Sequence, residues 1–68
     1  MPKAARVLAA LKRDDWVQIH QKGSHRRLEK AGVRVTFAFH NSRDLGNVDL
    51  VKIASNFGYT LDELRELL

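Results

Sequence analysis

The residues best suited to chemistry in this sequence stand in one short stretch, from Lys22 through Gly23, Ser24 and His25 to Arg27. Histidine can take up or release a proton near neutral pH. Lysine and arginine bind phosphate oxygens, and the planar arginine fork can hold two of them at once. A histidine surrounded by cations therefore predicts a site that binds a phosphate group and moves a proton beside it.

Cleavage of RNA without a metal ion is a reaction that would use such a site. The 2′-hydroxyl attacks the adjacent phosphate, so a base must take its proton, a cation must stabilise the phosphorane, and an acid must protonate the leaving 5′-oxygen. His25 fits the base, and the neighbouring cations fit the stabilising role. The acid stays open: His40 is the preferred candidate, and His20, Lys22 and a water molecule are the alternatives.

Each of these residues also has a simpler interpretation. A motif this short more often marks an exposed turn histidine that only adds to an RNA-binding face. Gly23 and Ser24 are common turn residues, and no base can be assigned to activate the Ser24 hydroxyl. The three histidines lack the spacing of a metal site and the chain has no cysteine, so a zinc site is a minor alternative.

The charge of the chain is unevenly distributed. The net charge is +4, but residues 1–43 hold ten Lys/Arg against three Asp/Glu, giving +7, and residues 44–68 hold two against five, giving −3. We therefore expect the first part to contact a polyanion such as RNA and the last part to give structural support or to contact a basic surface. This favours phosphate contacts for the basic residues Lys22, Arg26, Arg27 and Arg34.

Length and hydropathy limit the class of protein. A chain of 68 residues forms one domain, residues 1–68, with a small core. The longest apolar runs are far too short to span a bilayer, and the first residues lack the apolar stretch of a signal peptide. The sequence predicts a cytoplasmic protein that does not associate with membranes and needs no cofactor.

The hydrophobic pattern predicts the elements that would position the histidine. A helix begins near Pro2 and ends at Asp14, with apolar residues at helical spacing. Strands follow at residues 16–22, 25–30 and 33–39, joined by turns at 23–24 and 31–32. Asn47 is the expected N-cap of a second helix, which Gly58 terminates. Thr60 and Glu63 have the spacing of a capping box that starts a short last helix.

These elements predict an α+β fold, in which a three-stranded antiparallel sheet carries the helices on one face. Strict alternation sends seven apolar side chains toward the helices: Val17, Ile19, Leu28, Val33, Val35, Phe37 and Phe39. It leaves eight polar side chains on the other face: Gln18, His20, Lys22, His25, Arg27, Arg34, Thr36 and His40. A slip of one residue at Gly23 would put Arg26 in the place of His25. Trp16, Phe37, Phe39 and Phe57 are expected in the core.

The stretch "QKGSHRR" followed by "VRVTFAFH" resembles the HicA toxins, small RNA-cleaving members of bacterial toxin–antitoxin pairs. The resemblance extends over most of the chain, to "LVKIASNFG", which stands where the family has its second packing helix. It implies a fold similar to the double-stranded-RNA-binding domain, with His25 as the catalytic histidine of an mRNA-cleaving endoribonuclease. It also implies a HicB-like antitoxin that covers His25. The sequence departs from the family pattern at "NVDL" and at Arg26.

The predicted RNA-contacting residues around His25 are Lys22, Gly23, Ser24, Arg26, Arg27, Arg34 and His40. Two other kinds of function remain open. The same fold and charge would suit an RNA-binding module that recognises shape without cleaving. A small adaptor whose basic face binds an acidic protein is the third hypothesis.

Overall fold

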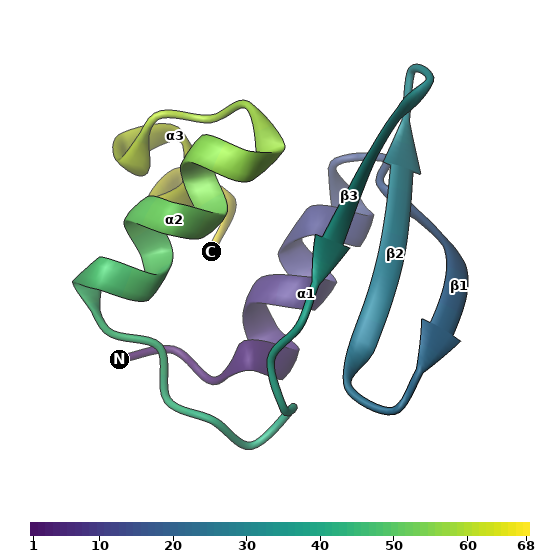
Figure 1. The fold of residues 1–68 in the computed structure, drawn as a ribbon. Helices are drawn as coiled ribbons and strands as arrows, with labels where there is room; N and C mark the ends of the chain where they lie inside the picture. Colours follow the sequence, from purple (N-terminus) through teal and green to yellow (C-terminus); the bar gives the residue numbers. More distant parts are fainter.

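A computed structural model describes all residues 1–68 (Figure 1). Its elements follow in the order α1 (Ala4–Arg13), β1 (Val17–Lys22), β2 (His25–Lys30), β3 (Val33–Phe37), α2 (Asn47–Phe57) and α3 (Leu61–Leu67). The strands form one antiparallel sheet in the order β1-β2-β3, with β2 in the centre. The predicted α+β fold with a three-stranded antiparallel sheet is confirmed.

Helix α1 forms because its apolar residues recur on one face. Val7, Leu8 and Leu11 are buried together with two alanines of the same face. The helix begins at Ala4, two residues later than Pro2 suggested, and an extended Lys3 precedes it. Arg13 is its last residue and Asp14 is its C-cap, and Asp15 follows with a positive φ of 73°.

Helix α2 has a different N-cap from the predicted one. Gly46 is the N-cap, in extended conformation and without a side-chain hydrogen bond, and Asn47 is the first helical residue. The Leu50 N–H donates to the Gly46 carbonyl oxygen at 3.0 Å, so the helical bonding already starts at Gly46. The predicted end is confirmed, because Gly58 adopts the left-handed conformation with φ 82°.

Helix α3 begins with the predicted capping box. The Glu63 N–H donates to Thr60 Oγ1 at 3.1 Å, and the Thr60 N–H donates to Glu63 Oε1 at 2.8 Å. Leu64 is fully buried against the core, and Tyr59 packs on the same cluster from before the helix. These contacts hold a seven-residue helix that would be too short to persist alone.

The two sheet turns have two residues each and positive φ angles where hairpins require them. At the first turn Lys22 pairs with His25 across Gly23 and Ser24, and Gly23 has φ 59°. At the second turn both central residues have positive φ, 50° at Ala31 and 79° at Gly32. The first turn and the loop after β3 lie at the same end of the sheet (Figure 1).

The predicted facing of β1 is wrong in its first half. The register shifts between Gln18 and His20, so Ile19 is a bulge residue without a partner. Gln18 pairs with Leu28 and shares its helix-covered face, whereas Val17 and Ile19 remain 61% and 44% exposed. Trp16 explains the change, because its indole is the side chain that enters the core at the start of this strand.

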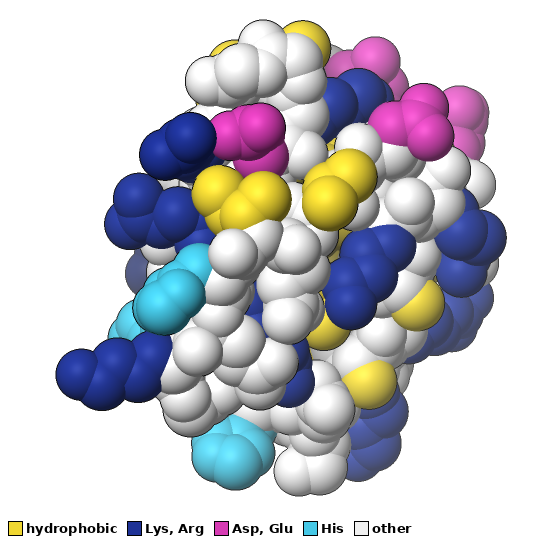
Figure 2. Space-filling view, turned by 90° about the vertical axis from the view of Figure 1, so that its right-hand side faces the viewer, with side chains coloured by type: hydrophobic (Ala, Val, Ile, Leu, Met, Phe, Trp, Pro, Cys, Tyr) yellow, Lys and Arg dark blue, Asp and Glu magenta, His cyan; other side chains and the backbone are white.

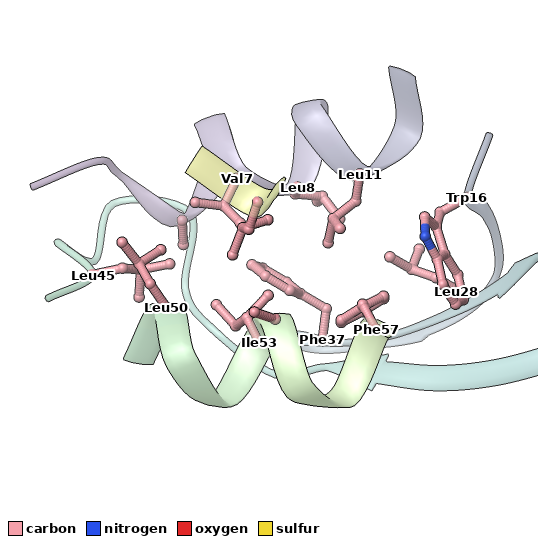
Figure 3. Close-up of a cluster of buried hydrophobic side chains, with 13 residues drawn as sticks. Val7, Leu8, Leu11, Trp16, Leu28, Phe37, Leu45, Leu50, Ile53 and Phe57 are labelled. Atoms are coloured by element: carbon pink, nitrogen blue, oxygen red, sulfur yellow. The ribbon is translucent and has the colours of Figure 1, made fainter. Parts of the chain in front are cut away.

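The core lies between the sheet and the two longer helices. Phe37 of β3 lies between α1 and α2 in Figure 3, and its ring centroid is 6.5 Å from that of Phe57. The Trp16 ring meets Phe57 edge to face at 4.8 Å. The predicted burial of Trp16, Phe37 and Phe57 is confirmed, and Phe39 is partly buried against this core.

A polar network closes the core beside α3. Trp16 Nε1 donates to the Tyr59 hydroxyl at 3.0 Å, and that hydroxyl donates to Asp14 Oδ2. Lys30 Nζ reaches the same carboxylate oxygen at 3.1 Å. The hydrogen bonds from Tyr59 and Lys30 lower the pKa of Asp14, and burial followed by the Asp14 bond raises the pKa of Tyr59 to about 12.

The last residues of the chain contact α1 and so support the fold. Structural support was one of the two roles expected for the acidic last part of the sequence. Arg6 and Arg13 of α1 donate hydrogen bonds to the main-chain oxygens of Leu68 and Leu67, at 2.9 and 3.0 Å. Because cations and carbonyl oxygens attract at a helix C-terminus, these contacts dock α3 onto α1.

Candidate active site

The sheet face without helices, here called the open face, carries the predicted catalytic histidine. Lys22 of β1 pairs directly with His25 of β2, and His20 pairs with Arg27. Arg27 pairs on its other side with Thr36 of β3. Residues directly opposed in a sheet share a face, so these five side chains lie together. They line one surface depression and are called the open-face cluster below.

Two local features of the chain place the cluster. The two-residue turn at Gly23 fixes the register that sets Lys22 opposite His25. The bulge at Ile19 then decides the facing of His20. Since Trp16 and Gln18 face the helices, strict alternation would point His20 inward as well, and the extra residue turns it to the open face.

The cations of this cluster are free of carboxylates. None of the four ion pairs in the protein involves Lys22 or Arg27. Both side chains are exposed, like His20 and His25. An incoming phosphate therefore need not displace an acidic side chain from them.

A second depression lies at the end of the sheet and is called the turn depression. Its lining consists of Gly23, Ser24, Arg26, His40 and Asn41. His40 was expected on the open face, but it lines this other depression beside Arg26, whose side chain lies on the helix-covered face. The reason is that β3 ends at Phe37, two residues before the predicted end, and His40 belongs to the loop.

Arg26 also has a structural role that its sequence context does not predict. Its side chain lies on the face opposite to that of His25, so the predicted facing of β2 is confirmed and the one-residue slip does not occur. Only 8% of Arg26 is exposed. The guanidinium donates to the Phe39 carbonyl oxygen at 3.3 Å and to Asn41 Oδ1 at 2.8 Å, which fixes the loop after β3.

No carboxylate neutralises Arg26, because it takes part in none of the ion pairs. A buried cation held only by neutral oxygens keeps its attraction for an anion in the turn depression. The Arg26 side chain thus holds the loop after β3 and also offers a positive charge to an anion in the turn depression.

Arg34 lies away from the other predicted site residues. Its Nε is 2.7 Å from Glu29 Oε2, its cross-strand partner on the open face. Glu29 is four residues along β2 from His25, toward the second turn. The structure therefore groups Lys22, His25 and Arg27 with His20, and leaves Arg34 paired and separate.

Thr36 and Asn41 were not predicted as site residues. The alternation of β3 put Thr36 on the open face, and its pairing with Arg27 brings it to the cluster. Asn41 has no comparable signal in the sequence, since its contact with Arg26 joins residues fifteen positions apart.

Figure 2 shows the molecule from the side of β1. Histidine side chains gather at one border with lysine and arginine side chains, and a further histidine lies apart at the lower end. No three His, Cys, Asp or Glu side chains come together in a group that could hold a metal ion. None of the helices has the length and apolar character needed to cross a membrane.

Comparison with known proteins gives one match. The family model described as "HicA toxin of bacterial toxin-antitoxin" matches residues 4–59, which run from the start of α1 to the second residue after α2. Searches of curated proteins and of solved structures found no significant match. The matched region contains the whole sheet, the open-face cluster and the turn depression.

Proposed function

Because this chain belongs to the HicA toxin family, it is the toxin of a toxin–antitoxin pair, and we propose that it acts as an endoribonuclease that cleaves mRNA in the cytoplasm without a metal ion. The observation that carries the proposal is the open-face cluster, in which two histidines and two unpaired cations share one depression. Phosphodiester cleavage by general acid–base catalysis requires groups that transfer protons, here the histidines, and groups that stabilise the charge of the phosphorane, here the cations.

In this mechanism His25 is the general base. Its imidazole takes the proton of the 2′-hydroxyl as the oxygen attacks the adjacent phosphorus. Lys22, directly across from His25, and Arg27, two residues further along β2 on the same face, bind the non-bridging oxygens and stabilise the negative charge of the phosphorane. Cleavage leaves a 2′,3′-cyclic phosphate and a 5′-hydroxyl.

The turn depression is the proposed site for a neighbouring phosphate of the same strand. Arg26 offers an uncompensated charge there, with the Ser24 hydroxyl, the Gly23 backbone and His40 around it. Since this depression and the open-face cluster flank the same turn, one flexible single strand can reach both. Arg34 is not expected to bind the reacting phosphate, because its guanidinium is already paired with the Glu29 carboxylate. Its role would be limited to a general attraction for RNA.

The antitoxin partner is proposed to be HicB-like and to inhibit by covering His25. An exposed cationic sheet face attracts an acidic partner surface, and a partner on this face blocks the base and the phosphate-binding cations together. Mixing equimolar antitoxin with the chain should therefore stop cleavage. Full cleavage within a stable complex of the two would contradict this mode of inhibition.

The test of the activity is cleavage of a long single-stranded RNA in EDTA, with RNA affinity measured in parallel. The parent chain should cut and leave cyclic phosphate ends, whereas His25→Ala should lose at least about 10²-fold in rate and still bind. Lys52→Ala, an exposed cation on α2, is the matched control.

The outcome separates two kinds of protein. If the parent and His25→Ala bind RNA equally and neither cuts, the chain is an RNA-binding module, the runner-up function. If neither binds RNA at low salt, the basic face serves a protein partner instead.

A further inference from the structure

The proposed reaction needs a second proton transfer. When the bond from phosphorus to the 5′-oxygen breaks, the leaving oxygen must receive a proton, and a base that has just become protonated on the attacking side cannot also act on the leaving side. From the sheet register we infer that His20 is the general acid. This assignment rests on the proposed nuclease function and adds a catalytic residue to it.

The register places the two imidazoles at a suitable separation. His20 pairs with Arg27, and His25 is two residues before Arg27 on the same strand, so the two histidines are diagonal neighbours on the open face. Diagonal neighbours in an antiparallel pair are about 7–8 Å apart, within reach of each other's longer side chains. Both line the same depression. A phosphate bound between them can have its attacking oxygen at one ring and its leaving oxygen at the other.

The cations complete the arrangement on the other diagonal. Lys22 is opposite His25 and Arg27 is opposite His20. The four side chains alternate in type around the depression, so each proton carrier has a phosphate-binding cation directly across the strand. The reacting phosphate can therefore be held by Lys22 and Arg27 while the histidines act on its two ends.

The other candidates for the acid fit less well. His40 lines the turn depression with the side chain of Arg26, which belongs to the opposite sheet face. Lys22 is directly opposite His25, which suits charge stabilisation on the attacking side. Lysine also holds its proton far more strongly than histidine near neutral pH, which makes it the weaker acid for this transfer.

The two proton transfers of the cleavage step balance. Neutral His25 accepts the 2′-hydroxyl proton as the bond from the 2′-oxygen to phosphorus forms. Protonated His20 gives its proton to the 5′-oxygen as the bond from phosphorus to that oxygen breaks. His25 ends protonated and His20 neutral, and exchange with water restores both. No oxidant, reductant or cofactor takes part.

A substrate with a better leaving group tests the assignment. In an oligoribonucleotide whose 5′-bridging oxygen is replaced by sulfur at one linkage, the leaving thiolate needs no protonation. His20→Ala should cut the normal linkage about 10²–10⁴-fold more slowly than the parent. It should cut the sulfur linkage within a few-fold of the parent rate, whereas His25→Ala should be slow on both.

Several results would overturn the inference. Equal losses on both linkages in His20→Ala would show that His20 positions the substrate or supports the sheet, and an unchanged rate on the normal linkage would show that it takes no part. Rescue by sulfur in His40→Ala but not in His20→Ala would move the acid to the loop. A parent chain that cuts neither linkage would instead defeat the proposed nuclease function, and the assignment with it.

Two controls make the comparison specific. Lys52→Ala should behave as the parent on both linkages, because it lies on α2 outside both depressions. Thermal unfolding of each variant should show that His20→Ala, at an exposed position on an edge strand, keeps the parent fold.

Discussion

Arg26 and Arg27 are adjacent in sequence but have opposite environments. Arg26 is buried and bonded to the loop after β3, whereas Arg27 is exposed on the open face. We expect Arg26→Met to lower the free energy of unfolding by about 1–3 kcal/mol, because the Phe39 and Asn41 oxygens lose their donor. Arg27→Met should change it by less than about 0.5 kcal/mol and weaken RNA binding instead. Urea unfolding and RNA titration of both variants check this, and equal stability losses would contradict it.

Tyr59 is the only tyrosine, so its ionisation can be followed by absorbance. Burial and the hydrogen bond to Asp14 raise its pKa to about 12, against 10.0 for an unperturbed tyrosine. Because the folded-state pKa is the higher one, its contribution to stability is complete below pH 10 and is lost as the pH rises toward 12. Asp14→Asn should lower the midpoint while leaving it above 10, since burial remains. A parent midpoint near 10 in the folded protein would refute this assignment.

At the scale of the elements, the turn between β2 and β3 has an unfavourable residue in a required conformation. Ala31 has φ 50°, which costs a residue with a Cβ about 1–2 kcal/mol. Ala31→Asn should raise stability by about 0.5–1 kcal/mol, since Asn-Gly is the preferred pair for such a hairpin. Gly32→Ala should destabilise although no atom lies within 4 Å of the added methyl group, because its φ of 79° is itself the obstacle.

Thermal unfolding measures both turn variants. A gain of this size shifts the midpoint of a domain this small by about 2–8 °C. Cleavage by Ala31→Asn should equal that of the parent, because this turn is at the opposite end of β2 from His25. A lower melting temperature for Ala31→Asn would mean that the alanine has a packing role that outweighs the backbone cost.

At the scale of the whole molecule, the basic open face and the acidic helix α3 lie on different sides of the sheet. The open face carries unpaired cations, whereas α3, with three acidic residues, packs on the helical side. RNA affinity should therefore fall steeply with salt. Removing Lys22 and Arg27 together should reduce the slope of log affinity against log salt by about 1.4, or 0.7 for each phosphate contact. Lys52→Ala should leave it unchanged, and an equal effect of Lys52→Ala would indicate unspecific attraction.

The sequence by itself determined the features that depend on neighbours along the chain. The turn at Gly23, the capping box of Thr60 and Glu63 and the end of α2 at Gly58 each arise from contacts within a few residues, and all are present. Short-range turn chemistry also explains why His25 could be placed on the open face. The order of elements followed from the same local signals.

Tertiary structure alone decided which face several side chains occupy. Trp16 enters the core against Phe57, forty-one positions away, and the resulting bulge at Ile19 reverses the facing of Val17 and Gln18. Arg26 is buried because Asn41 and the Phe39 carbonyl lie within reach of its guanidinium, and the same loop carries His40 away from the open face. Strict alternation assumes a strand without a bulge. The position of the bulge depends on which side chains pack in the core, and this packing involves residues far apart in the sequence.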